Sequence, residues 1–429
     1  MKLGFICLDL PGHLNPMSAL ARQLQARNHE VVFLYSSGAA GLPFVRGPEK
    51  DHINENRPEA SKKQGEDALQ FSVRAVLAQT EAILKSLPAM VQANGIDAVI
   101  IDTVQFYAEL GAMQLGMPYV HVSNGVHHDY SGYTPLCLYG WPHETTPAAL
   151  ARNREAVAKW TNLLGSVNGG IKAYAESTGL KIDWNDLDST ISPLASITQV
   201  PRAFDFESSH WPSQFHHTGP FQNGIGRKKI DFPWERLTGE PLIYASIGTI
   251  LNGKADVFRT IVTAVAKNKN VQLVLSIGDQ IDPKQIGPVP HNAIVVKQAP
   301  QLELLKQATL CITHAGLNTV LESLAQGVPQ VAIPITYDQP GVAARIADKK
   351  TGVVTSLDKL TTDHLALLIN EALTDPVYRE NSHKLQKAIA EANGLSVAAD
   401  LITESLQSSR NIKASASSVC LQGMLRQGT

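Results

Sequence analysis

The sequence predicts an α/β protein built from two Rossmann-like, doubly wound domains that face each other across a cleft. Short apolar runs alternate with segments of helical periodicity, which is the pattern of a parallel sheet with crossover helices. The alternation occurs in two series, separated by a stretch rich in Pro, Gly and charged residues near 220–240. A chain of 429 residues is long enough for two or three domains with cores of their own.

The first series begins at the N-terminus. Lys2–Leu8 is a short apolar run that predicts a strand, and apolar residues three to four positions apart from Leu14 to Leu24 predict a helix. Glu30–Tyr35 predicts the next strand and completes one βαβ unit. Two more strands and the helix between them are expected at Asp97–Asp102, Tyr119–Asn124 and Phe106–Leu115.

The second series follows a linker expected at 223–240. That linker separates a first domain of residues 1–222 from a second of residues 241–406, which ends in helices from about Leu360 onward. Strands of the second domain are expected at Pro241–Gly248, Gln272–Gly278, Ile294–Lys297, Leu310–Thr313 and Gln330–Ile335, with helices such as Asp256–Asn268 and Leu317–Gln326.

Two segments are expected to lie outside this framework. Arg46–Asp67 is highly charged and contains two prolines, which favours an exposed, mobile loop. Residues 407–429 are rich in Ser and contain no acidic residue, which is typical of a disordered tail.

The composition excludes several classes of protein. Lys plus Arg number 37 and Asp plus Glu 39, so the formal charge of −2 gives no electrostatic footprint for nucleic acid or an anionic membrane. The apolar run before Asp9 is too short for a signal peptide, and no window approaches 18 apolar residues. The four cysteines form no CxxC pair and are expected as free thiols. We therefore expect a soluble, cytoplasmic protein without stable membrane insertion.

The most specific pattern surrounds the end of the strand at Leu310–Thr313. His314-Ala315-Gly316 follows this strand and opens a helix with Asn318 and Thr319 in its first turn. Ligands of open α/β sheets bind beyond the carboxyl ends of the strands, where the free N–H groups of a helix N-terminus attract an anion. A phosphate or diphosphate fits this site, although a His in this position can also serve only as a cap.

Three more side chains extend this site. Glu322, one turn into the helix, can accept hydrogen bonds from ribose hydroxyls. Asp338 and Gln339 follow the next strand at the same edge of the sheet and are suited to sugar hydroxyls. Taken together, these residues have a spacing that is hard to produce by chance.

The run from Gln298 to Gln339 resembles the nucleotide-sugar signature of family-one glycosyltransferases with the GT-B fold. That group contains plant natural-product glucosyltransferases and bacterial macrolide and carotenoid glycosyltransferases, and the bacterial branch is the most similar. The resemblance extends to Tyr244–Asn252, similar to the loop at the donor diphosphate. It implies a donor site made by Ser246, Thr249, Gln298, Ala299, Gln301, His314, Gly316, Asn318, Thr319, Glu322, Asp338 and Gln339.

One departure from the family concerns the base of the donor nucleotide. The family often has a Trp that stacks on uracil where this chain has Gln298. Loss of that aromatic surface removes on the order of 1 kcal/mol of binding. A thymidine-diphosphate sugar therefore stays open as donor, while Asp338-Gln339 resembles the glucose-preferring form of the motif.

A second specific pattern follows the first strand. Pro11–Pro16 (PGHLNP) holds a single Gly where a dinucleotide-binding turn needs G-x-G-x-x-G, so nicotinamide or flavin dinucleotides are not expected. His13 lies at the carboxyl edge of the sheet with a pKa suited to a general base, and Asp102 ends a strand at that same edge. Taken alone, each could be a satisfied loop or capping residue. In the family resembled, the corresponding His is the base and the Asp its partner.

The loop after Tyr119–Asn124 is expected to bind the acceptor. Aromatic walls with a few polar tips suit a flat, lipophilic, hydroxylated molecule, although ordinary loop packing would use the same residue types. The candidates are Asn124, His127, His128, Tyr130, Tyr133 and Trp141.

No metal site or cofactor is expected beyond the nucleotide sugar, which is a co-substrate. Asp186-Leu187-Asp188 matches the metal motif of another glycosyltransferase fold, but it follows no buried strand. His210, His216 and His217 have a loosely metal-like spacing in an irregular, aromatic segment.

The sequence thus predicts an inverting glycosyltransferase that moves a hexose from a UDP-sugar to a hydroxyl of a flavonoid, polyketide or carotenoid. Alternatives are the same reaction with a dTDP-sugar such as dTDP-rhamnose, a sugar-nucleotide epimerase or cell-wall glycosyltransferase of the same fold, and a non-catalytic nucleotide-sugar-binding protein. Its partners are the nucleotide sugar and a small acceptor, without nucleic acid, and the protein is expected as a monomer or weak dimer.

Overall fold

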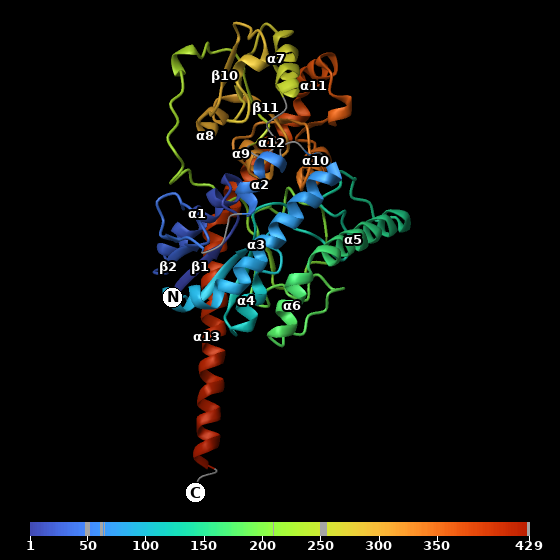
Figure 1. Ribbon diagram of the computed structural model, residues 1–429. Coiled ribbons are helices and arrows are strands. Elements are labelled where there is room, and N and C mark those ends of the chain that lie inside the picture. The colour runs from blue at the N-terminus through green and yellow to red at the C-terminus, as the bar shows by residue number, and fades with distance from the viewer. Residues whose placement is uncertain (48–51, 61–62, 64, 209, 249–254, 427–429) are drawn as a thin grey trace.

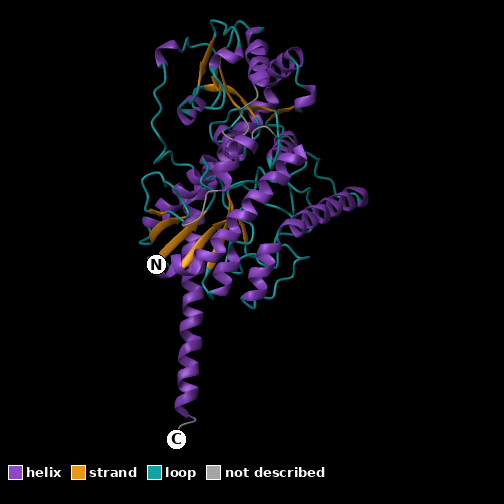
Figure 2. Cartoon of the chain, in the orientation of Figure 1, coloured by secondary structure: helices purple, strands orange, loops and turns teal. Residues whose placement is uncertain are grey.

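The computed structural model describes residues 1–47, 52–60, 63, 65–208, 210–248 and 255–426. It contains two domains, the first coloured blue to green in Figure 1 and the second yellow to orange. Each domain has its own parallel sheet with helices around it, and the two groups of strands are separate in Figure 2. The predicted α/β class with two Rossmann-like domains is confirmed.

The first domain has a seven-stranded sheet in the order β3-β2-β1-β4-β5-β6-β7, in which every paired neighbour is parallel. The strand order reverses at β1 and β4, which places the ligand crevice at their carboxyl ends. Its strands are β1 (Lys2–Ile6), β2 (Glu30–Leu34), β3 (Phe44–Val45), β4 (Ala98–Asp102), β5 (Tyr119–Ser123), β6 (Ser196–Thr198) and β7 (Phe215–His217). Its helices are α1 (Pro11–Gln25), α2 (His52–Ala60), α3 (Gly65–Asn94), α4 (Glu109–Gln114), α5 (Pro147–Val167) and α6 (Gly169–Ser177).

The second domain has a six-stranded parallel sheet in the order β10-β9-β8-β11-β12-β13. Its strands are β8 (Leu242–Ser246), β9 (Gln272–Ser276), β10 (Ala293–Val296), β11 (Ala308–Thr313), β12 (Gln330–Ala332) and β13 (Gly352–Val354). The helices that follow are α7 (Ala255–Ala266), α8 (Gln301–Leu305), α9 (Leu317–Leu324), α10 (Gln339–Asp348), α11 (Thr362–Thr374), α12 (Pro376–Ala392) and α13 (Gly394–Arg426).

The last helix returns to the first domain. Leu395, Ala398, Ile402 and Leu406 of α13 are buried in the same cluster as apolar residues of β1 and α1. In addition, Arg27 Nε donates to Asp400 over 2.6 Å. The assignment of the terminal helices to the second domain, residues 241–406, is therefore wrong for α13, because its apolar face completes the first core.

Two predicted irregular segments contain helices. The described part of Arg46–Asp67 holds α2 and the start of α3, where the backbone N–H of His52 donates to Gln79 Oε1 over 2.9 Å. The segment expected as a tail at 407–429 is helical as far as Arg426, as the continuation of α13. The sequence of α13 contains no proline that would interrupt the helix.

Cys7, Cys137 and Cys311 are buried and free, as expected; the side chain of Cys420 lies outside the described residues. Among the described residues, no helix is both long and apolar enough to cross a bilayer.

Candidate functional site

A histidine–aspartate pair lies at the carboxyl edge of the first sheet. His13 is in the first turn of α1, after β1, and Asp102 is the last residue of β4, the neighbouring strand. His13 Nδ1 donates to Asp102 Oδ2 over 2.6 Å. Because the carboxylate accepts this hydrogen bond, Nδ1 keeps its proton and the lone pair of the neutral ring is on Nε2. The two residues expected to form a dyad are in contact.

The surroundings of this pair favour the protonated imidazole. Asp102 is fully buried, and the side chain of His13 is 19% exposed. Burial acts to lower the pKa of His13, but the charge and hydrogen bond of Asp102, with a smaller contribution from Asp338, raise it above its usual value. A proton accepted at Nε2 would therefore be stabilised.

Asp338 brings a second carboxylate to this region from the other domain. It directly precedes α10, and its Oδ2 accepts from the backbone N–H of Val126 over 2.9 Å. Gly125 permits this approach, since a Cβ there would lie 2.9 Å from the carboxylate oxygen. Burial raises the pKa of Asp338, although Val126 and His13 act in the opposite direction.

Gln339 follows at the first position of α10 and is 5% exposed. Its Oε1 accepts from the backbone N–H groups of Ile335 and Thr336 over 2.8 and 3.1 Å. The amide oxygen is thus used within the protein, and the amide nitrogen is the group that can donate to a sugar hydroxyl.

His314 lies between two glycines beside the start of α9. A Cβ at Gly248 or at Gly316 would lie 2.5 Å from His314 Nε2, so larger residues there would displace the ring. Ala315 has a φ of 64°, an uncommon backbone conformation for a residue other than Gly. Burial lowers the pKa of His314 to about 4, so the ring is neutral at pH 7. It can offer an anion one N–H group, not a positive charge.

Asn318 connects the two domains. Its Nδ2 donates to the carbonyl of Gly12 over 2.6 Å, and its Oδ1 accepts from Gln199 Nε2 over 2.9 Å. The side chain expected to bind the donor therefore touches the residue before His13. Gln199 was not predicted, because no local pattern marks a lone glutamine.

Glu322 is held by residues of its own chain. Its 1% exposed carboxylate accepts from the guanidinium of Arg227, in the linker, and from Gln301 Nε2 over 2.6 Å. Gln301 Nε2 lies 3.4 Å from Thr319 Oγ1, and Gln301 Oε1 accepts from Tyr244 over 3.0 Å. Three predicted donor residues thus meet, but Arg227 occupies the position where ribose hydroxyls were expected. The basic run Arg227–Lys229 was the available signal for this contact.

The remaining donor candidates are dispersed. Gln298 is exposed, and its Nε2 donates to Asp279 Oδ2 over 3.0 Å. Ala299 packs into the core of the second domain, so only its backbone could contact a ligand. Ser246 ends β8 beside the end of β11, as predicted, whereas Thr249 lies outside the described residues.

The acceptor candidates do not form one wall. His128 stacks on Tyr130 and on Trp160, with ring centroids 5.5 and 5.6 Å apart. Tyr133 instead contacts His210, and Trp141 stacks on Tyr139 at 4.1 Å, next to Arg152.

Asn124 is the acceptor candidate at the sheet edge itself. It follows β5 and is 2% exposed, and neither polar atom of its side chain has a hydrogen-bond partner among the described residues. A buried amide without a partner is costly. The side chain is therefore available to a hydroxylated ligand.

His127 lies in a buried ion-pair network and not in an acceptor wall. Its Nε2 is 3.1 Å from Asp205 Oδ2, and His217 Nε2 is 2.6 Å from that same oxygen. Arg345, from α10 of the second domain, pairs with Asp205 Oδ1 over 2.8 Å. The ligand atoms of the two histidines and Asp205 lie within 4.8 Å of one another. The guanidinium already balances the carboxylate charge, so this group joins the domains without requiring a cation.

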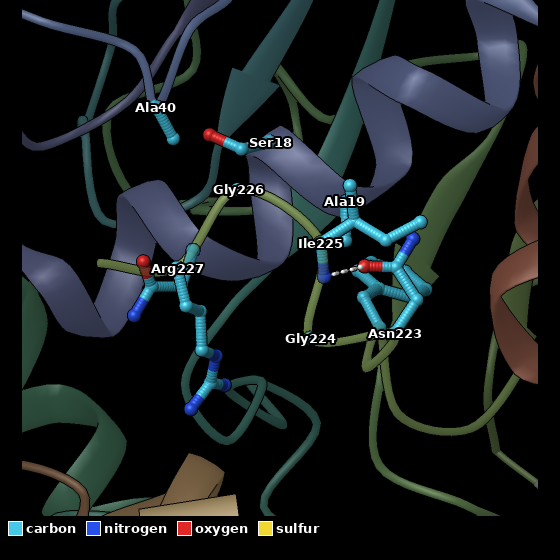
Figure 3. A pocket seen from close by; sticks show the side chains of 10 residues that line it. Ser18, Ala19, Ala40, Asn223, Gly224, Ile225, Gly226 and Arg227 are labelled. Atoms are coloured by element: carbon cyan, nitrogen blue, oxygen red, sulfur yellow. Dashed lines mark hydrogen bonds between the residues drawn. The ribbon is translucent and has the colours of Figure 1, made fainter. Parts of the chain in front are cut away.

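A small pocket lies between α1 and the linker (Figure 3). Asn223 and Arg227 line it, and the backbone N–H of Ile225 donates to Asn223 Oδ1 over 3.0 Å. Ser18, from α1, has a buried hydroxyl without a partner among the described residues. The space open to a water-sized molecule is about 10 Å³, far below the roughly 300–1,000 Å³ of ligand pockets, and suits solvent under the linker.

The chain is similar to known glycosyltransferases in sequence and in fold. Residues 236–391 match the family model described as UDP-glucoronosyl and UDP-glucosyl transferase. Zeaxanthin glucosyltransferase of Pantoea ananas is 27% identical over 91% of this chain and 93% of that protein. An NDP-glycosyltransferase of Bacillus subtilis is 25% identical over 92% of this chain and 95% of that protein. The crystal structure of the glycotransferase of kitacinnamycin superposes with a TM-score of 0.74 at 25% identity, over 94% of this chain and 99% of the other.

Proposed function

Since this chain is a glycosyltransferase of the GT-B fold, we propose that it transfers glucose from UDP-glucose to a hydroxyl of a small lipophilic acceptor. Its residues 236–391 match the UDP-glucoronosyl and UDP-glucosyl transferase family. The observation that carries the proposal is the His13–Asp102 pair. Gly12, directly before His13, accepts a hydrogen bond from Asn318 at the start of α9. A base and an anion-binding helix end at one cleft are what glycosyl transfer from a nucleotide donor requires.

The proposed reaction is a single displacement with inversion. His13 Nε2 takes the proton of the acceptor hydroxyl as its oxygen bonds to the anomeric carbon. The bond from that carbon to the diphosphate breaks, and the nucleoside diphosphate leaves with the electron pair. Positioning and base catalysis, the latter worth roughly 10²–10⁴-fold, both lower the barrier.

The donor is held at α9 in this proposal. The diphosphate lies at the N–H groups of the α9 N-terminus, with one further donor from neutral His314. The ribose hydroxyls replace Arg227 at Glu322, and the sugar lies near Asp338 and Gln339. These groups are the protein's own, so we propose that no metal ion is required.

The relatives support a natural-product or carotenoid acceptor, since one of them is named for zeaxanthin. Gln298 is exposed and offers no aromatic ring to stack on uracil, so a thymidine-diphosphate sugar stays the alternative donor. The buried free thiols support a cytoplasmic location. A non-catalytic nucleotide-sugar-binding protein would have no use for the His13–Asp102 pair.

The test is mass spectrometry of products from purified protein, EDTA and a panel of hydroxylated acceptors, with UDP-glucose and a thymidine-diphosphate sugar in parallel. We expect a hexose adduct that survives EDTA. His13→Ala should lower its formation about 10²-fold or more with little change in the affinity for UDP. Full activity of His13→Ala would refute the base assignment, and UDP binding without any adduct would support the non-catalytic alternative.

A further inference from the structure

A buried glutamine links the sheet edge of the first domain to the donor helix α9. Gln199, directly after β6, is completely buried. Its Nε2 donates to the carbonyl of Asn124 over 2.7 Å and to Asn318 Oδ1 over 2.9 Å. Its Oε1 is 3.4 Å from the backbone N–H of Phe221, near the start of the linker. One side chain thus contacts the end of β5, a residue just before the linker, and the second domain.

Backbone groups at its ends determine the orientation of this chain of amides. The carbonyls of Asn124 and Gly12 can only accept, and the N–H of Phe221 can only donate. Gln199 must therefore direct its NH₂ group toward Asn124 and Asn318. Asn318 in turn must direct its oxygen toward Gln199 and its NH₂ group toward Gly12. Reversal of either amide would place like groups in contact, so the network has one consistent arrangement.

This arrangement controls the approach of the two reacting groups. Gly12 precedes His13, whose Nε2 is the proposed base, and Asn318 stands in the first turn of α9, where the donor diphosphate is proposed to lie. Gln199 and Asn318 carry no titratable group, and none of the hydrogen bonds described for them reaches the imidazole. Their effect on the reaction must act through the positions of the first turn of α1 and of α9.

We propose that Gln199 is a positioning residue that sets the amide of Asn318 and so couples the donor helix α9 to the first turn of α1, which carries His13, across the domain boundary. The coupling to catalysis rests on the proposed function of His13, whereas the coupling between the domains does not. Without Gln199, Asn318 can rotate and the carbonyl of Gly12 loses a directed donor. The first turn of α1 then samples positions in which His13 Nε2 is too far from the acceptor hydroxyl.

Two variants of Gln199 test this proposal in the full-length protein. Gln199→Met keeps the length and removes all the hydrogen bonds, and Gln199→Glu keeps the shape but turns a carboxylate toward two oxygens. We expect both to lower kcat about 10- to 100-fold while the Kd for UDP changes less than about threefold. Unchanged kcat in both variants would overturn the proposal, as would a loss of UDP affinity equal to the loss of kcat.

Gln272→Met is the matched control. Gln272 is 2% exposed in β9, and it joins the linker residues Arg236 and Thr238 by hydrogen bonds of 2.7 and 2.8 Å. Its replacement removes a buried amide of the same kind away from the cleft. We expect a comparable loss of stability with kcat unchanged. A drop in kcat equal to that of Gln199→Met would attribute the effect to general destabilisation and overturn the proposal.

Hydrogen–deuterium exchange tests the coupling between the domains separately from the proposed transferase activity. Gln199→Met should speed exchange in the first turns of α1 and α9, and Gln272→Met should not. This readout needs no substrate, so wild-type protein without transferase activity would refute the function and leave the domain coupling tested. Equal exchange in the wild type and Gln199→Met would refute the coupling even in an active enzyme.

Discussion

Two carboxylates, one from each domain, raise the pKa of His13. Asp102 binds the imidazole directly, and Asp338 acts through space. The raised pKa of His13 strengthens it as a base but also shifts its protonation toward neutral pH. Activity should therefore fall on the acidic side of the pH–rate profile at a pH set by both carboxylates.

Asp102→Asn tests this electrostatic assignment. The amide oxygen can still accept from Nδ1, but the negative charge is gone, so the pKa of His13 should fall. We expect the acidic limb of kcat/KM against pH to move to lower pH and kcat to drop about 10²-fold or more. Asp338→Asn should move this limb in the same direction by less. An acidic limb that stays in place in Asp102→Asn would mean that another group titrates.

Gln298 stands where the family resembled often has a Trp that stacks on the nucleotide base, so it is the residue at which the proposed base contact can be tested. The residue is exposed and its only described hydrogen bond is to Asp279, so a larger ring can be placed there without disturbing a core. Gln298→Trp should tighten UDP binding by about 1 kcal/mol, roughly fivefold in Kd, through stacking. Titration calorimetry measures it, with Gln298→Leu as a control that loses the amide and gains no ring. Equal Kd values for the Trp and Leu variants would place the base elsewhere.

The helix α13 connects the two halves of the protein. It follows α12 in sequence but buries Leu395, Ala398, Ile402 and Leu406 against the first domain. Its path runs back along α1 in Figure 1. The linker and α13 are thus two covalent crossings between the domains.

Leu406→Ala tests the contribution of α13. Leu406 is completely buried, and its truncation should cost about 2–5 kcal/mol, with faster hydrogen exchange in α1. Leu367→Ala in α11 is the control, because that leucine is 69% exposed and should change stability by less than about 0.5 kcal/mol. Urea unfolding supplies both numbers. Similar losses in the two variants would show that α13 contributes little to the first core.

Buried histidines make the free energy of unfolding of the whole molecule depend on pH. Burial lowers the pKa of His128 and of His314 to about 4, and it lowers that of His127 as well. The unfolded chain takes up these protons near pH 6.5, whereas the folded protein takes them up only at lower pH. Stability from these groups is therefore present above pH 6.5 and is lost between pH 6.5 and 4. The raised pKa of His13 acts in the opposite direction.

His128→Phe isolates one of these contributions. Phe keeps the ring that stacks on Trp160 and cannot take up a proton in either state. Relative to wild type, the variant should gain stability as the pH falls from 7.5 to 4.5, because it lacks the proton that unfolding takes up. Urea unfolding at several pH values measures the difference. A difference that does not depend on pH would contradict the lowered pKa of His128.

Much of the framework was predictable from local patterns. β4 is buried along its whole length and reads as an apolar run, whereas β6 and β7 have three residues each and no such pattern. His13 and Asp102 could be paired because both follow strands at one sheet edge. The contacts of Arg227 with Glu322 and of Gln199 with Asn318 join residues about 100 positions apart. Such contacts depend on how the domains approach, which no local pattern encodes.

The return of α13 to the first domain has a consequence for biosynthesis. A ribosome releases the chain from its N-terminus, so β1 to β7 emerge long before Leu395 to Leu406 are translated. Until then, the apolar surface that α13 covers on α1 and β1 is open to water. Until α13 leaves the exit tunnel, the N-terminal domain is therefore an incomplete folding intermediate, and its exposed apolar surface is of the kind that chaperones bind.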